Sequence, residues 1–281
     1  MMEKEREIIL VPFDFTINSE NSLLHALQLA QVAGSRILLA YIIRRGIFSK
    51  PATEEEKSEF EQKLEAIAGE IEKSHSIKPD TIVREGKIKC LKDLLLERNI
   101  NLMVMGQQFS FGKYKIDANE IISVFKTSRI KKVAPIIITQ QPPAHSRYVE
   151  IVVPINYQRE FKETLRWVMH LSKFYNCNIN FIKPFYTDPE KKKLMANNMY
   201  FTKKMLDNNH IVYGIKTAKK AKNYSEEITR FAGDIDADLI VIMADKYKDF
   251  MHESKSRNGQ EQNHIPIMCI KPMPKKFQGF Y

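Results

Sequence analysis

Residues 101–139, NLMVMGQQFSFGKYKIDANEIISVFKTSRIKKVAPIIIT, decide the fold of this chain. The stretch predicts a buried strand that ends in Gly106, a polar loop with a second glycine, an amphipathic helix and another apolar strand. In an α/β protein, a loop between the carboxyl end of a buried strand and a helix N-terminus is a natural site for an anion or a nucleotide phosphate. The stretch therefore indicates both a fold class and the first place to look for a ligand.

The same pattern occurs twice in the chain. With Val11-Pro12 aligned to Val153-Pro154, residues 8–42 and 150–184 correspond without a gap at an offset of 142, and LMVMG at 102–106 corresponds to LIVIMA at 239–244. The i, i+3, i+4, i+7 spacing of a core-facing helix recurs in both copies. Its members are Leu23, Ala26, Leu27 and Ala30 in the first copy, and Leu165, Val168 and Met169 begin the second. We therefore predict two tandem domains, at 1–140 and 149–281, joined by a linker at 141–148 whose Pro142 and Pro143 make it stiff.

Each copy is predicted to be a doubly wound, Rossmann-like α/β domain. Its strands are continuously apolar rather than alternating, which indicates a parallel sheet covered by helices on both faces. In the first copy we expect strands at 8–11, 37–42, 81–84, 102–105 and 136–139, and helices at 19–33, 54–74, 87–98 and 117–132. In the second copy we expect helices near 160–175, 189–208 and 224–234.

Composition and charge exclude several classes of protein. The N-terminal residues MMEKEREIILVPFDF fit neither a signal peptide nor a membrane span, and no apolar run approaches the roughly 18 residues that a span needs. The cysteines, Cys90, Cys177 and Cys269, are far apart, so we expect buried thiols and a cytoplasmic protein. Residues 145–281 hold 23 Lys/Arg against 15 Asp/Glu, whereas residues 1–144 hold 21 against 19. The second copy is thus the basic one.

The succession of a VPxD strand, an ILLxx strand, an LIVMG-type strand and an xPxxxx strand resembles the universal stress protein family over residues 7–271. The resemblance implies a five-stranded parallel sheet in the order 3-2-1-4-5, a stress-linked role and, in some members, ATP binding. It also implies that the last strands pair, here Ile136–Thr139 with Ile267–Ile270, in an intrachain pseudo-dimer. A homodimer and an unknown protein partner are further possibilities that the resemblance leaves open.

The resemblance also points to a nucleotide site in the first copy. ATP-binding members carry Gly-x2-Gly-x9-Gly-Ser/Thr after the fourth strand, because backbone N–H groups cradle phosphates where no Cβ intervenes. Here the pattern is Gly106-x5-Gly112-x9-Ile122-Ser123, with Phe109 at the family's second glycine position. The residues carried over for ATP or AMP are Asp14 and Tyr41 at the adenine end and Gly106, Gly112 and Ser123 at the phosphate end.

Two interpretations of this loop stand side by side. The three additional residues and the bulky Phe109 and Ile122 argue against an ordinary ATP site, although Lys113 and Lys115 could supply compensating charge. In the other interpretation, the two glycines only permit the turn. In the second copy, Asn156 replaces Asp14 and Ala244 replaces Gly106, so we expect a structural or partner-binding half there.

No motif indicates catalysis or a metal site. GxSxG, HExxH and GxxxxGK[ST] are all missing, so we expect no enzyme, with a weak ATPase as the remaining alternative. His252, Glu253, Glu261 and His264 lack the spacing of metal ligands, and we interpret them as solvated loop residues.

Three functions remain. The first is a non-catalytic, universal-stress-type protein that binds partners or a small ligand. The second is an adenine-nucleotide switch in the first copy. The third is electrostatic binding of nucleic acid by the lysines and aromatic residues of the second copy, for which no nucleic-acid motif is present.

Overall fold

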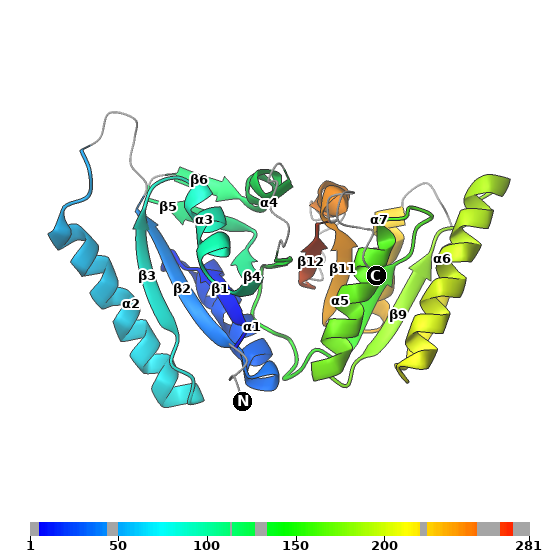
Figure 1. The fold of residues 1–281 in the computed structure, drawn as a ribbon, viewed down its shortest axis with the longest axis horizontal. Helices are drawn as coiled ribbons and strands as arrows, with labels where there is room; N and C mark the ends of the chain where they lie inside the picture. The colour runs from blue at the N-terminus through cyan, green and yellow to red at the C-terminus, as the bar shows by residue number, and fades with distance from the viewer. Residues whose placement is uncertain are drawn as a thin grey trace. The chain divides into compact units, whose positions relative to one another are not determined.

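The computed structural model describes residues 6–43, 50–112, 114–126, 134–219, 224–251 and 265–271 (Figure 1). The chain divides into two compact units, Met1–Pro143 and Ala144–Tyr281, and the boundary falls within the predicted linker. Some residues considered above lie outside the described residues: Lys113, His252, Glu253, Glu261 and His264.

The first unit contains the expected five parallel strands. Strand β1 pairs with β2 and β4, β2 pairs with β3, and β4 pairs with β7, which gives the order β3-β2-β1-β4-β7. Right-handed crossovers place α1 and α2 on one face of the sheet and α3 and α4 on the other. The elements are β1 (Ile8–Pro12), α1 (Ile17–Ala33), β2 (Arg36–Ile43), α2 (Glu54–His75), β3 (Asp80–Glu85), α3 (Lys89–Glu97), β4 (Ile100–Gly106), β5 (Gln108–Phe111), β6 (Tyr114–Asp117), α4 (Ala118–Lys126) and β7 (Ile136–Thr139).

The second unit repeats this order. Strand β8 pairs with β9 and β11, β9 pairs with β10, and β11 pairs with β12, all in parallel. The order β10-β9-β8-β11-β12 is again 3-2-1-4-5, so the predicted doubly wound α/β class is confirmed for both copies. The elements are β8 (Glu150–Pro154), α5 (Phe161–Phe174), β9 (Asn178–Lys183), α6 (Pro189–Asn208), β10 (Tyr213–Thr217), α7 (Tyr224–Asp234), β11 (Leu239–Met243), the 3₁₀ turn η1 (Ala244–Lys246), α8 (Tyr247–Met251) and β12 (Ile267–Ile270).

The central strands are buried as their apolar runs predict. Every residue of β1, β4, β7 and β11 is buried, because helices cover both faces of the sheet. The predicted core-facing residues of α1 are buried too: Leu23, Ala26, Leu27 and Ala30 are each no more than 4% exposed. Cys177 and Cys269 are buried as expected, whereas Cys90 is only half-buried, because α3 lies next to the exposed end of β3.

The segment between β4 and α4 differs from the prediction. It was expected to be a polar loop, but residues 108–117 form the antiparallel hairpin β5–β6, with Phe109 opposite Ile116 and Phe111 opposite Tyr114. Gly112 takes up the left-handed conformation at the turn, with φ of 60°. QFSFGKYKID alternates polar and apolar residues around Gly-Lys, which is the pattern of a two-residue hairpin. The signal was therefore present in the sequence.

A row of buried polar side chains on α1 holds the chain that follows β7. The amide of Asn21 donates to the carbonyl of Gln140 over 3.2 Å, and the hydroxyls of Ser22 and Thr139 are 2.8 Å apart. One turn further along α1, His25 Nε2 lies 3.0 Å from the carbonyl oxygen of Gln141. Burial lowers the pKa of His25 from 6.5 to about 4, so the buried imidazole is neutral near pH 7.

We expect His25 to make the protein acid-sensitive. Because its pKa is lower in the folded chain than in the unfolded one, its contribution to stability is complete above pH 6.5 and is lost as the pH falls toward 4. Between pH 7.5 and pH 5 this loss is about 2 kcal/mol in the free energy of unfolding. Urea denaturation at both pH values, compared with His25→Gln, measures it. Equal losses in the two proteins would contradict the assignment.

Candidate functional site

The carboxylate of Asp14, at the predicted adenine end, is bound by the protein's own backbone. Its Oδ2 accepts a hydrogen bond from the Ser110 N–H of β5 over 2.6 Å. Its Oδ1 accepts from the N–H and the hydroxyl of Thr16, over 3.2 and 2.5 Å. Both carboxylate oxygens are therefore occupied, and the hairpin lies where a base would approach Asp14.

Aromatic rings fill the space beside Asp14. The Tyr41 and Phe60 rings stack with centroids 4.2 Å apart, and Phe15 lies 5.3 Å from Tyr41. Phe13 extends this cluster, with its ring 5.4 Å from Phe15. Burial and the charge of Asp14 raise the pKa of Tyr41. The resemblance assigned Tyr41 to the adenine end of a nucleotide site, and here its ring packs against Phe15 and Phe60.

The phosphate end is also occupied by protein groups. The first turn of α4 is capped by Asp117, whose Oδ1 accepts from the N–H of Asn119 over 2.6 Å. A carboxylate in this position uses the helix N-terminus and repels an incoming phosphate. In addition, the Ala118 N–H donates to the carbonyl of Gln107, and the Gln107 N–H donates to that of Thr139. These backbone groups do not point at a ligand.

The remaining predicted phosphate residues serve the fold or lie at the surface. Gly106 belongs to β4, and a Cβ there would lie 2.9 Å from Asn18 Cβ and 3.2 Å from the Gln108 carbonyl oxygen. Gly112 forms the tip of the hairpin, and Ser123 lies on the exposed side of α4. Phe109 and Ile122, 2% and 3% exposed, replace glycines with core side chains. The arrangement of these residues does not fit the binding of ATP or AMP. Their contacts agree with the interpretation that the two glycines only permit the turn.

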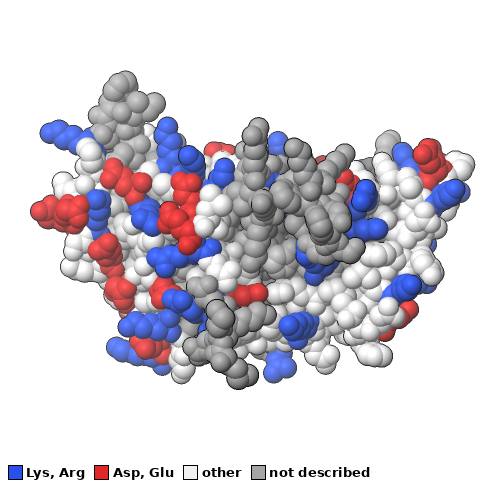
Figure 2. Space-filling model, viewed as in Figure 1, with Lys and Arg blue, Asp and Glu red and all other residues white. Residues whose placement is uncertain are grey.

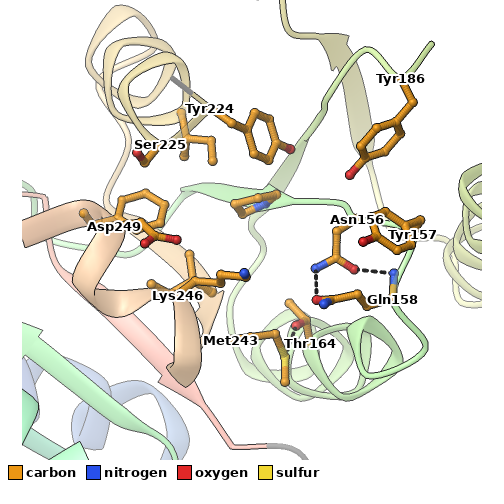
Figure 3. Close-up of a pocket in the computed structure, with 14 residues that line it drawn as sticks. Asn156, Tyr157, Gln158, Thr164, Tyr186, Tyr224, Ser225, Met243, Lys246 and Asp249 are labelled. Atoms are coloured by element: carbon orange, nitrogen blue, oxygen red, sulfur yellow. Dashed lines mark hydrogen bonds between the residues drawn. The ribbon is translucent and has the colours of Figure 1, made fainter. Parts of the chain in front are cut away.

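The second unit contains a cavity of about 500 Å³ at the carboxyl ends of β8 and β11 (Figure 3). This is the crevice where parallel α/β sheets bind ligands, and the volume suits a small molecule. Its lining combines tyrosines, amides and apolar side chains with one lysine and one aspartate: Pro154, Asn156, Tyr157, Gln158, Thr164, Tyr186, Tyr224, Ser225, Ile228, Ile242, Met243, Lys246, Asp249 and Phe250.

Hydrogen bonds hold the loop between β8 and α5 at one side of this cavity. Asn156 Oδ1 accepts from the Gln158 N–H over 2.9 Å, and the Asn156 amide donates to Gln158 Oε1 over 3.3 Å. Asn198 of α6, which is 8% exposed, donates to the carbonyls of both residues over 2.8 and 3.0 Å. The polar edge of the cavity is therefore preorganised by a buried amide.

Tyrosines also line the cavity. The Tyr224 hydroxyl donates to the carbonyls of Ile155 and Ile182 over 3.2 and 2.6 Å, which fixes the start of α7 against the ends of β8 and β9. The Tyr157 and Tyr186 rings lie 5.4 Å apart, edge to face. Burial, with the neighbouring Tyr157, raises the pKa of Tyr186 to about 12. At neutral pH its hydroxyl is therefore a hydrogen-bond donor rather than a base.

Lys246 and Asp249 supply the charges. In Figure 3 the amino group of Lys246 points into the cavity, with the carboxylate of Asp249 nearby. Both side chains are exposed, and among the described residues neither forms an ion pair. Lys246 ends η1, which follows β11 directly, so no glycine loop precedes it. Among the described residues that line the cavity, Lys246 is the one cation, and they form no phosphate cradle.

Sequence reasoning missed this cavity. The repeat placed Asn156 at the position of Asp14, but the change from aspartate to asparagine suggested loss of the site. The other polar lining residues come from separate segments with no fixed spacing, so no motif marks them. The site becomes visible only when the strand ends are brought together.

Comparison with known proteins agrees with the fold. The sequence profile of the universal stress protein family matches residues 5–109. Residues 5–109 of the first unit therefore carry the sequence pattern of the universal stress protein family. This confirms the resemblance noted in the sequence, and the second unit has the same strand order. No functionally curated protein matches the sequence.

Two solved structures share this fold along nearly the whole chain. A universal stress protein from Archaeoglobus fulgidus DSM 4304 has a TM-score of 0.66 and 15% identity, covering 95% of this chain and 96% of that one. A functionally unknown protein from Pseudomonas aeruginosa PAO1 has a TM-score of 0.60 and 13% identity, covering 95% and 93%. Within the described ranges, no helix is both long and apolar enough to cross a bilayer.

Replacement of Gly106 tests its role in the fold. Gly106→Ala forces Cβ against Asn18, so we expect a loss of about 1–3 kcal/mol in the free energy of unfolding. Gly69→Ala is the matched control, because nothing lies within 4 Å of the added Cβ in α2. That change should stabilise the protein by about 0.5–1 kcal/mol. Urea denaturation measures both, and an unchanged stability of Gly106→Ala would refute the close packing.

Replacement of Asp14 tests whether its carboxylate holds the hairpin. Asp14→Ala should cost about 1–3 kcal/mol and accelerate amide exchange in residues 107–117, because the Ser110 and Thr16 donors lose their acceptor. Asp80→Ala removes an exposed carboxylate paired with Arg36 and serves as control, with an expected cost below about 1 kcal/mol. Hydrogen exchange read by mass spectrometry gives the result. If amide exchange in the hairpin is the same in Asp14→Ala as in the unchanged protein, this role is contradicted.

Proposed function

We propose that the protein is a non-catalytic, cytoplasmic, universal-stress-type protein whose small-ligand site is the cavity of the second unit. The observation that carries the proposal is the contrast between two equivalent positions. At the strand ends of the first unit, Ser110 and Asp117 satisfy the groups that would contact a nucleotide. At the strand ends of the second unit, a cavity of about 500 Å³ lies between Asn156, Tyr186 and Lys246.

The lining favours a planar ligand with polar edges and little negative charge. Tyrosine rings and Ile228 offer flat apolar contacts, while the loop amides and the Tyr186 hydroxyl offer hydrogen bonds. Lys246, the one cation among the described lining residues, can balance a monophosphate but not a triphosphate. Adenosine and AMP have this chemistry, so we propose the second unit as the adenine-nucleotide site, in place of the first unit that the sequence indicated.

The chemistry of the lining supports binding rather than catalysis. Burial raises the pKa of both Tyr186 and Tyr224, which keeps their hydroxyls protonated at neutral pH. The Thr164 hydroxyl is 2% exposed and donates to the sulfur of Met243, so it is not placed as a nucleophile. These groups can orient a ligand without a ready proton acceptor.

The cellular location belongs to the same proposal, and the partners are considered with it. A cytoplasmic location is supported by Cys90, Cys177 and Cys269, which form no disulfide bond with one another. Partner binding, a homodimer and association through Ile136–Thr139 and Ile267–Ile270 stay predictions from the sequence.

The proposal predicts that adenosine and AMP bind in this cavity and that the phosphate of AMP contacts Lys246. Isothermal titration calorimetry should give heat for both ligands and weak or no heat for ATP. Lys246→Ala should weaken AMP about tenfold and adenosine less, since only AMP carries a charge for the lysine. Lys248→Ala is the control, because Lys248 is exposed on α8 and does not line the cavity.

Two outcomes would overturn the proposal. One is the absence of heat from adenosine, AMP and related nucleosides in a protein that is fully folded by circular dichroism. The other is nucleotide binding that Asp14→Ala abolishes and Lys246→Ala leaves unchanged, which would return the site to the first unit.

A further inference from the structure

A second cavity of the same unit has a different chemistry. It measures about 540 Å³ and lies between α6 and the carboxyl ends of β9 and β10. It shares only Tyr186 with the cavity described above. Its floor and walls combine methionines and aromatic rings with three lysines, Lys183, Lys192 and Lys203.

Large apolar groups are open to solvent at this cavity. Phe185 is 55% exposed and Tyr200 is 71% exposed, although neither lies at a chain terminus. Met195 and Met199 lie on the α6 face beside them, one buried and one half-buried. Methionine side chains are flexible and polarisable, so they adapt to apolar ligands of varied shape. This surface is therefore suited to contact with an apolar ligand.

The lysines mark the two ends of this apolar floor. Lys192 and Lys203 are eleven residues apart on α6, which places them on the same face of the helix about 16 Å apart. Lys192 Nζ lies 5.9 Å from the Phe185 ring centre. Among the described residues, none of the three lysines forms an ion pair. Figure 2 shows a largely uncharged surface near α6, with both basic and acidic side chains on it.

From this arrangement we propose that the cavity binds a free single-chain carboxylate, with its apolar chain on Met195 and Met199 and its carboxylate at Lys192 or Lys203. The lysines favour a negatively charged ligand group, and the methionine side chains favour an aliphatic chain. A nucleic acid fits less well, because its bases need a succession of flat aromatic platforms. Here methionines lie between the lysines instead.

Decanoate, used below its micelle concentration, is the probe, and the full-length protein carries ¹³C-methyl methionine. Met195→Leu and Met199→Leu assign the two signals. We expect both signals to shift on titration with decanoate and to stay in place with decyltrimethylammonium, which has the same chain and the opposite charge. The double variant Lys192→Glu/Lys203→Glu should weaken decanoate at least tenfold.

The matched control is Lys193→Glu/Lys204→Glu, on the same helix and with the same change of charge, at exposed residues that do not line the cavity. It should bind decanoate like the unchanged protein. Equal binding of the cationic chain, or equal weakening by both double variants, would overturn the proposal. So would binding to phosphatidylglycerol vesicles or to a dT12 oligonucleotide without any response to decanoate. Adenosine binding is measured separately and does not depend on this result.

Discussion

The hydrogen bond from the Ser110 N–H to the carboxylate of Asp14 determines what the first unit can do. This hydrogen bond is 2.6 Å long and joins the loop after β1 to the hairpin after β4. The two residues are 96 positions apart in the chain. A hydrogen bond to an ionised acceptor is among the stronger ones in proteins. With this contact made, Phe109 is buried and Asp117 caps α4. The strand ends of the first unit are therefore stabilised by protein groups.

The strand ends of the second unit are arranged differently from those of the first unit. Asn156 has the place of Asp14 in the repeat, and its side chain bonds to Gln158 in its own loop. The segment after β11 continues directly into η1 and α8 rather than folding back as a hairpin. Tyr224 and Asn198 fix the neighbouring elements in position by donating to backbone carbonyls. A cavity is left where the first unit has a hairpin.

The sequence predicted the architecture well because burial governs it. Continuously apolar strands and the helical spacing of Leu23, Ala26 and Leu27 depend on local pattern alone, and the repeat doubled that signal. The hairpin was missed because glycine spacing was given more weight than the alternation around Gly112. The cavity at the carboxyl ends of β8 and β11 could not be predicted, because it depends on which side chains leave space unfilled. That is a property of packing in three dimensions, to which Tyr186, Tyr224 and Lys246 contribute from separate segments.

We propose that the ligand site lies in the second unit and that the first unit is closed by its own hairpin. A crystal structure of the full-length protein grown with AMP tests it most directly. We predict ligand density between Asn156, Tyr186 and Lys246, with Ser110 still bonded to Asp14. Density between Asp14 and Gly106, with the hairpin displaced, would contradict the account.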